Sequence, residues 1–180
     1  QPILRNQYKV LRHLRKIPDL IRLKNQEKIL GNKAIIVSLM YTMYENAKRR
    51  EDQEKYDMAT LLWYRLLEMI EQRRLMTYQI YVSKPEYQKT DFSNAAKEYA
   101  GLNAQEQMNL LKSRNYTLKK ELFKNNDKDY LPNPIALLDG YILLAALGDK
   151  ISNGKDGKAM NQLKRIRSMV SLRNNSIFAH

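Results

Sequence analysis

The chain contains no cysteine, and only two of its 180 residues are histidines. The absence of cysteine excludes disulfides, thiolate metal sites and thiol catalysis. Two histidines, His13 and His180, are too few for a multi-histidine zinc site within one chain. Glycine and proline are also scarce, with six and five residues respectively, which favours long regular elements over a loop-rich all-β fold.

No apolar run is long enough to cross a membrane. The longest, residues 135–147, contains Asp139 and Gly140, whereas a span needs about 20 apolar residues. The N-terminal region mixes basic and apolar side chains and shows no signal peptide, so we expect a cytoplasmic protein without membrane contact. Because the chain begins at Gln1 and stops at His180 within a helical pattern, we expect a fragment of a longer protein.

Positive charge is present in excess. The chain has 32 Lys and Arg residues against 19 Asp and Glu residues, a formal net charge of +13. Such an excess favours an acidic partner, most often nucleic acid or a membrane surface. A solvated basic surface without a partner is the alternative. The hydrophobic share of 43% is sufficient for a core.

Apolar residues recur at steps of three and four along most of the chain, which predicts one all-α domain around an antiparallel helical bundle. The expected helices cover residues 4–14, 29–48, 56–80, 93–100, 104–112, 116–123, 134–147 and 158–172. Asp91 or Ser93 is expected to cap the fourth helix, and Pro134 to lie at or near the first turn of the buried helix that Gly148 ends.

Residues 56–80 give the strongest helical pattern, so we expect this helix to be central. It carries Glu68 and Glu71 beside several arginines, and we interpret both carboxylates as members of surface ion pairs. Three tyrosines in apolar series are expected to be packed: Tyr8, Tyr41 and Tyr56.

The last eight residues hold a second set of polar groups, with Arg173 and Asn174 followed by His180. A spacing of seven places Arg173 and His180 on one helix face, about 10 Å apart along the axis. Metal-free RNA cleavage needs a base, an acid and a cation at the phosphate, and His and Arg have these properties. Since one histidine cannot easily be both acid and base, this reading predicts a homodimer with the site at its two-fold axis.

The alternative is a frayed helix end with Asn as its cap and His180 as the last ordered residue. Arg and His seven residues apart are a weak pattern by themselves.

The run 172–180, Leu-Arg-Asn-Asn-Ser-Ile-Phe-Ala-His, resembles the signature of HEPN-domain ribonucleases. With its Arg-Asn pair, Ser176 and the final Ala-His, it is similar to type III CRISPR-associated ribonucleases that join a CARF sensor domain to a HEPN effector. Residues 47–75 resemble a second pattern of that subfamily, with Ala47, Arg49 and Arg50 followed by Tyr-Arg-x-x-Glu. The resemblance covers residues 30–180 and leaves 1–29 as an N-terminal helical extension.

The resemblance implies a dimerising, HEPN-like all-α bundle with additional short helices. It implies a metal-independent endoribonuclease without cofactor that cuts single-stranded RNA to 2′,3′-cyclic phosphate and 5′-hydroxyl ends. The catalytic set would consist of Arg173, Asn174 and His180. Arg173 would stabilise the charge of the transition state, His180 would transfer the proton, and Asn174 would orient a phosphate or the histidine ring. The activator, cyclic oligoadenylate, would bind a CARF domain that we expect outside this fragment.

Five further residues are expected to contact RNA or position the catalytic set: Arg65, Glu68, Arg165, Arg167 and Ser176. Glu68 would pair with Arg65 or with Arg173, and the alternative for all these charges is a solvated surface or a structural ion pair. Two other functions remain open: a non-catalytic RNA-binding or dimerisation module, and the toxin of a toxin–antitoxin pair.

Overall fold

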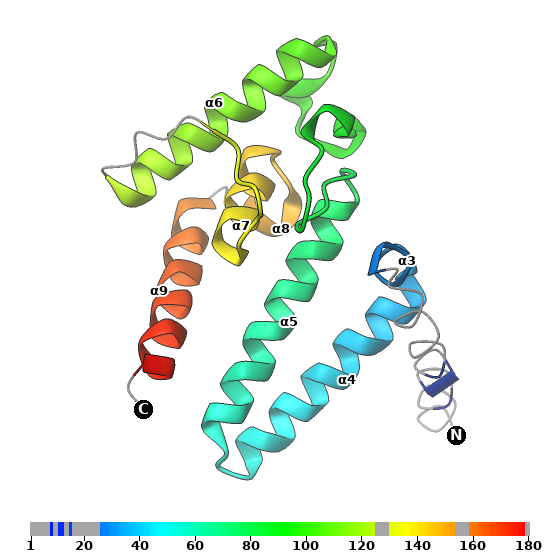
Figure 1. Ribbon diagram of the computed structural model, residues 1–180, viewed down its shortest axis with the longest axis vertical. Coiled ribbons are helices and arrows are strands. Elements are labelled where there is room, and N and C mark those ends of the chain that lie inside the picture. The colour runs from blue at the N-terminus through cyan, green and yellow to red at the C-terminus, as the bar shows by residue number, and fades with distance from the viewer. Residues whose placement is uncertain are drawn as a thin grey trace. The chain divides into compact units, whose positions relative to one another are not determined.

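A computed structural model describes residues 8, 11–12, 15, 26–124, 130–153 and 159–178, and the regular elements in this part of the chain are helices. These residues include no β-strand, which confirms the all-α fold (Figure 1). None of the described helices combines the length and the hydropathy of a membrane span. The expected helix over residues 4–14 lies largely outside the described residues, as does His13.

The chain divides into two compact units, Gln1–Met76 and Thr77–His180. The division expected from the sequence, between an extension over 1–29 and a domain over 30–180, stays a prediction.

The first unit is built on a helical hairpin. Helix α3 (Gln26–Gly31) leads into α4 (Lys33–Asp52), and a short turn connects α4 to α5 (Tyr56–Met76), which packs along it (Figure 1). The side chain of Asn32 caps α4 by accepting a hydrogen bond from the Ile35 amide at 3.2 Å. The buried apolar residues of the hairpin are Ile35, Ile36, Ala47, Ala59, Tyr64, Leu66 and Leu75.

Two expectations for the first unit are wrong in detail. Helix α5 ends at Met76 rather than near residue 80, and Gln79 has a φ of 59°, which a right-handed helix does not allow. Tyr8, Tyr41 and Tyr56 are all more than half exposed. Their rings fit an apolar helical stripe by spacing, but the phenol hydroxyl lets tyrosine lie at the surface without an unpaired polar group.

The second unit surrounds one buried helix, α7 (Leu137–Ala146), in which eight of the ten residues are buried. Three helices pack against it: α6 (Ala104–Phe123), α8 (Lys150–Asn153) and α9 (Ala159–Phe178) (Figure 1). The sequence predicted this buried helix from its long apolar run, and α9 from its periodicity.

The C-terminal end of α7 lies tightly against the segment that precedes α6. Gly148 ends the helix, as predicted, with a φ of +72°, and a Cβ there would lie 2.4 Å from the Ala96 Cβ. The Ala96 amide donates to the Leu147 carbonyl at 2.8 Å. The Tyr78 hydroxyl donates to the Asp149 carboxylate at 2.6 Å. Only glycine permits this close approach of the two segments.

The segment over 93–100 is not an α-helix. It forms two 3-10 turns, η2 (Phe92–Asn94) and η3 (Lys97–Tyr99), and a third, η1 (Tyr87–Lys89), lies in the expected loop before them. Asp91 caps η2 as predicted, since its side chain accepts from the Ser93 amide at 2.9 Å.

The two helices expected over 104–112 and 116–123 are one continuous helix, α6. It begins with a reciprocal capping box between Asn103 and Glu106. Pro134 does not lie in the first turn of α7, which begins three residues later at Leu137. Ala136 is the N-cap of α7 and has an extended conformation. The Ile135 amide donates to the Val82 carbonyl at 3.0 Å.

Candidate functional site

Arg173 lies on the face of α9 that points toward the core of the second unit. Leu163 and Ile166 are buried on this face, and Arg173 follows Ile166 by seven residues, which is nearly two helical turns. The Arg173 side chain is half-buried, and its Nε atom has less than 1 Å² of exposed surface. The surrounding protein therefore restrains this guanidinium, which does not extend freely into solvent.

The other members of the C-terminal motif are placed only in part. Asn174 is exposed on α9, next to Arg173 in sequence but on a different side of the helix. The backbone of Ser176 is helical, because α9 continues to Phe178. The position of the Ser176 side chain and all of His180 lie outside the described residues. The continuous helix supports the expectation that the motif follows helical spacing up to Phe178.

Helix α9 is strongly basic. It carries four cationic residues and no acidic one: Lys164, Arg165, Arg167 and Arg173. Arg165 is exposed, and a contact of its guanidinium with an RNA backbone stays a prediction. The absence of carboxylates makes this helix a surface of one charge sign.

Arg167 connects α9 to the end of α6. Its Nη1 atom donates to the Leu122 carbonyl at 2.6 Å, and its guanidinium carbon lies 4.9 Å from the centroid of the Phe123 ring. A C-terminal carbonyl of α6 thereby gains the hydrogen bond that the helix itself does not supply. Arg167 thus stabilises the fold, and a contact of its remaining N–H groups with RNA stays a prediction.

Arg65 and Glu68 lie in the first unit and form an ion pair with each other on α5. The Arg65 side chain is 68% exposed, so water screens this pair. One of the two pairings expected for Glu68 is therefore present, and its pairing with Arg173 stays a prediction.

Glu71 is not a surface residue, and that expectation is wrong. Its exposed fraction is 2%, and its Oε1 atom accepts no hydrogen bond from the described residues. Burial, together with the negative charge of Glu68, raises the pKa of Glu71 to about 9. Glu71 consequently holds its proton at neutral pH. The signal was present in the sequence, since Glu71 lies on the same stripe as the buried Tyr64 and Leu75, at helical spacings of seven and four.

No three His, Asp or Glu side chains come close enough to hold a metal ion within the described residues. The described side chains of the C-terminal motif are the guanidinium of Arg173 and the amide of Asn174, and both lie on the basic helix α9.

Residues 28–180 match the family model of the Csm6 HEPN domain. Comparisons with curated proteins and with solved structures found no similar protein. The matched range contains both motifs on which the resemblance to HEPN ribonucleases rests, and HEPN domains are generally ribonuclease modules. Because the match extends over most of the chain, from α3 to the C-terminal motif, the protein belongs to the Csm6 HEPN domain family.

Proposed function

We propose that the chain is a metal-independent endoribonuclease domain that cuts single-stranded RNA. The observation that carries the proposal is the placement of Arg173, which α9 holds half-buried at the start of the Arg-Asn…His motif on a helix without acidic residues. The family match extends over the whole motif.

The proposed reaction is attack of the ribose 2′-oxygen on the adjacent phosphorus. The P–O5′ bond breaks, and the products are a 2′,3′-cyclic phosphate and a 5′-hydroxyl. Arg173 would stabilise the negative charge that develops on the phosphoryl oxygens, since a guanidinium matches their geometry with two parallel hydrogen bonds. His180 would transfer the proton, because imidazole titrates near neutral pH. Asn174 would orient the phosphate or the imidazole ring.

The proposed active unit is a homodimer with a composite site. The reaction removes a proton from the 2′-hydroxyl and adds one to the leaving 5′-oxygen, and two His180 side chains across a two-fold axis would perform these two steps separately. The proposed role is that of a type III CRISPR antiviral effector in the cytoplasm. Cyclic oligoadenylate bound to a CARF sensor domain would activate it.

The test is cleavage of 5′-labelled single-stranded RNA in EDTA by the wild type and by His180→Ala and Arg173→Lys. Lys97→Ala is the matched control, because it removes one exposed positive charge outside α9. We expect cyclic phosphate ends from the wild type and the control only. Arg173→Lys keeps the charge but loses the forked hydrogen bonds, so its rate should fall by about 10²-fold or more.

Cleavage by His180→Ala at the wild-type rate would reject the role of His180, and loss of all cleavage in EDTA would reject the metal-independent mechanism. A composite site also predicts that the rate per chain rises with protein concentration until the dimer is saturated. Binding without cleavage, by this chain and by a longer form joined to its sensor domain, would favour the non-catalytic module. Inhibition by the product of a neighbouring gene would favour the toxin.

A further inference from the structure

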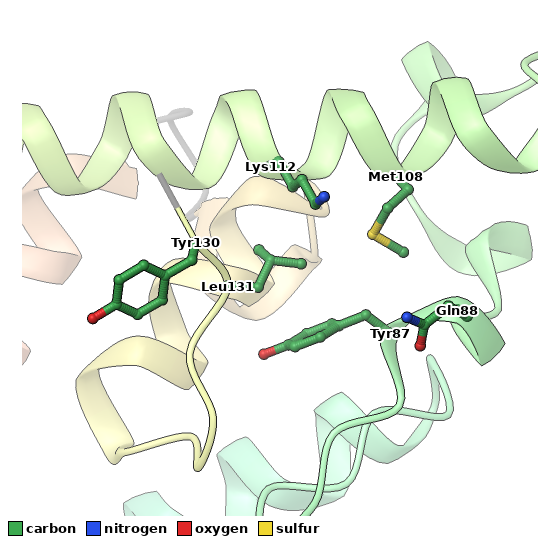
Figure 2. A pocket seen from close by; sticks show the side chains of 6 residues that line it. All are labelled: Tyr87, Gln88, Met108, Lys112, Tyr130 and Leu131. Atoms are coloured by element: carbon green, nitrogen blue, oxygen red, sulfur yellow. The ribbon is translucent and has the colours of Figure 1, made fainter. Parts of the chain in front are cut away.

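The second unit contains a pocket that the C-terminal motif does not explain. It has a volume of about 280 Å³ and lies between α6 and the turn η1. Figure 2 shows it with side chains from α6 on one side and those of η1 on the other. We call it the α6 pocket, and its lining residues are Tyr87, Gln88, Met108, Lys112, Tyr130 and Leu131.

The ring of Tyr87 forms a fixed aromatic wall of the α6 pocket. Its hydroxyl donates to the Pro132 carbonyl at 2.6 Å, which holds the half-buried ring in one orientation. Burial, and secondarily the charge of Asp139, raises the pKa of Tyr87, so the phenol remains neutral. A neutral ring that is already ordered loses little entropy when a flat ligand stacks on it.

The opposite wall supplies a cation. Lys112 and Met108 extend from α6 toward the space above Tyr87, and Leu131 lies beside them (Figure 2). Gln88, at one end of the pocket, offers both amide donors and an amide acceptor. An aromatic face, an apolar border, an amide and an ammonium group together suit a nucleobase with its phosphate.

Further basic and aromatic residues continue from the α6 pocket along the same helix. They recur every four residues and form what we call the α6 stripe: Lys112, Tyr116, Lys120 and Lys124. The last three of them line a second, more open depression of about 580 Å³, together with Thr117 and Glu121. The Lys120 ammonium lies 5.8 Å from the centroid of the Tyr116 ring. At 1.5 Å per residue the α6 stripe is roughly 18 Å long, enough for more than one nucleotide.

We propose that the α6 pocket and the α6 stripe bind single-stranded RNA, with one base stacked on Tyr87 and its phosphate on Lys112. The inference rests on the proposed function in that the chain acts on RNA, but it adds a binding surface separate from Arg173 and His180. RNA is favoured over an acidic peptide because tyrosine rings lie beside the cations in both the pocket and the stripe, and a peptide carboxylate needs only the cations.

The test measures binding of a fluorescent 2′-O-methyl oligonucleotide by anisotropy. This strand lacks the attacking hydroxyl, so the wild-type chain cannot cut it by the proposed reaction. Lys112→Ala and Tyr130→Ala remove exposed side chains of the α6 pocket, and Lys97→Ala, which removes an exposed lysine from η3, is the matched control. A thermal melt of each variant verifies that it is folded.

We expect Lys112→Ala and Tyr130→Ala each to weaken binding about fivefold or more, while Lys97→Ala stays near the wild type. Lys112→Ala should also lower the salt dependence of log K by about 0.7. Tyr87→Phe keeps the ring and should bind nearly as well as the wild type. A 5-iodouridine oligonucleotide should crosslink to the peptide that contains Tyr87 or the one that contains Tyr130.

The inference is wrong if Lys112→Ala and Lys97→Ala bind equally, if crosslinks fall only on α9, or if the wild type binds no oligonucleotide. Lys112-dependent binding of polyglutamate with no binding of the oligonucleotide would also overturn it in favour of an acidic peptide. Lys112-dependent binding of uridine monophosphate alone would assign the pocket to a free nucleotide and overturn the RNA assignment. RNA binding that depends on Lys112, in a chain that cuts no RNA, would support this site and reject the proposed cleavage.

Discussion

Glu71→Gln should change how the stability of the protein depends on pH. In the folded chain, burial raises the pKa of Glu71 to about 9, whereas the ordinary value of a glutamate is 4.5. The folded state therefore keeps a proton that the unfolded chain releases above about pH 4.5. Since the folded state binds more protons throughout this window, the free energy of unfolding falls as pH rises, and the fall ends near pH 9.

The size of the effect follows from the pKa difference. Each pH unit within the window removes about 1.4 kcal/mol of stability, so the wild type should lose roughly 4 kcal/mol between pH 5 and pH 8 through this one group. Glutamine has the shape of the protonated side chain and no titration. At pH 7 the variant should be more stable by up to about 3 kcal/mol, reduced by any cost of burying the new amide N–H groups.

The assay is urea unfolding of the wild type and of Glu71→Gln at pH 5 and at pH 8. Glu45→Gln is the control, because Glu45 is exposed on α4. The difference in unfolding free energy between wild type and variant should grow with pH for Glu71 and stay constant for Glu45. Parallel curves for the Glu71 variant, or a variant that is less stable at pH 8, would refute the reasoning, since Glu71 would then be ionised and paired in the folded chain.

Four further substitutions test the packing of the second unit, each by thermal or urea unfolding. Gly148→Ala should destabilise by about 3 kcal/mol, because positive-φ strain adds to a clash, whereas Gly101→Ala, with open space around it, should cost only about 1 kcal/mol. Equal losses of stability in the two glycine variants would show that Ala96 moves to accommodate the Cβ added at residue 148. Tyr78→Phe should cost about 2 kcal/mol by removing the hydrogen bond to Asp149. Arg167→Ala should cost about 1–2 kcal/mol, because it removes the contacts with the Leu122 carbonyl and the Phe123 ring. Unchanged stability would show that these contacts do not stabilise the fold, and RNA contact would then be the one expected role of Arg167.

The sequence predicted elements well where local pattern and tertiary packing agree. Helix α7 is apolar on nearly all sides and ends at a glycine, so its existence and its C-terminal end were both predictable. Helix α6 was divided in two because polar residues interrupt its apolar stripe. Asn115 and Lys119 are nonetheless buried there, and the Lys119 ammonium lies 2.7 Å from an Asp139 carboxylate oxygen on α7. A charge neutralised by a residue 20 positions away leaves no local signal.

The sequence indicated which residues belong to the candidate site, but not how deeply their side chains are buried or what they contact. The motif itself singled out Arg173 and Asn174, but no spacing rule indicated that one would be half-buried and the other exposed. Arg167 was expected at an RNA surface by its charge, and its contact with the Leu122 carbonyl depends on how α9 packs on α6. The α6 pocket was missed because its walls come from three segments, and only their packing brings Tyr87 and Lys112 together.

The ionisable side chains of Arg173 and Glu71 lie on helix faces whose neighbouring residues are buried and apolar. Arg173 continues the face of α9 that begins with Leu163 and Ile166, and Glu71 lies between Tyr64 and Leu75 on the buried face of α5. Even a paired buried charge rarely stabilises a fold as much as a well-packed apolar group of the same volume. Departures of this kind from local consistency are expected at functional positions. Glu71 avoids the cost of a buried charge by keeping its proton. A half-buried guanidinium at position 173 costs stability that an apolar side chain there would not, which fits the phosphate-binding role proposed for it.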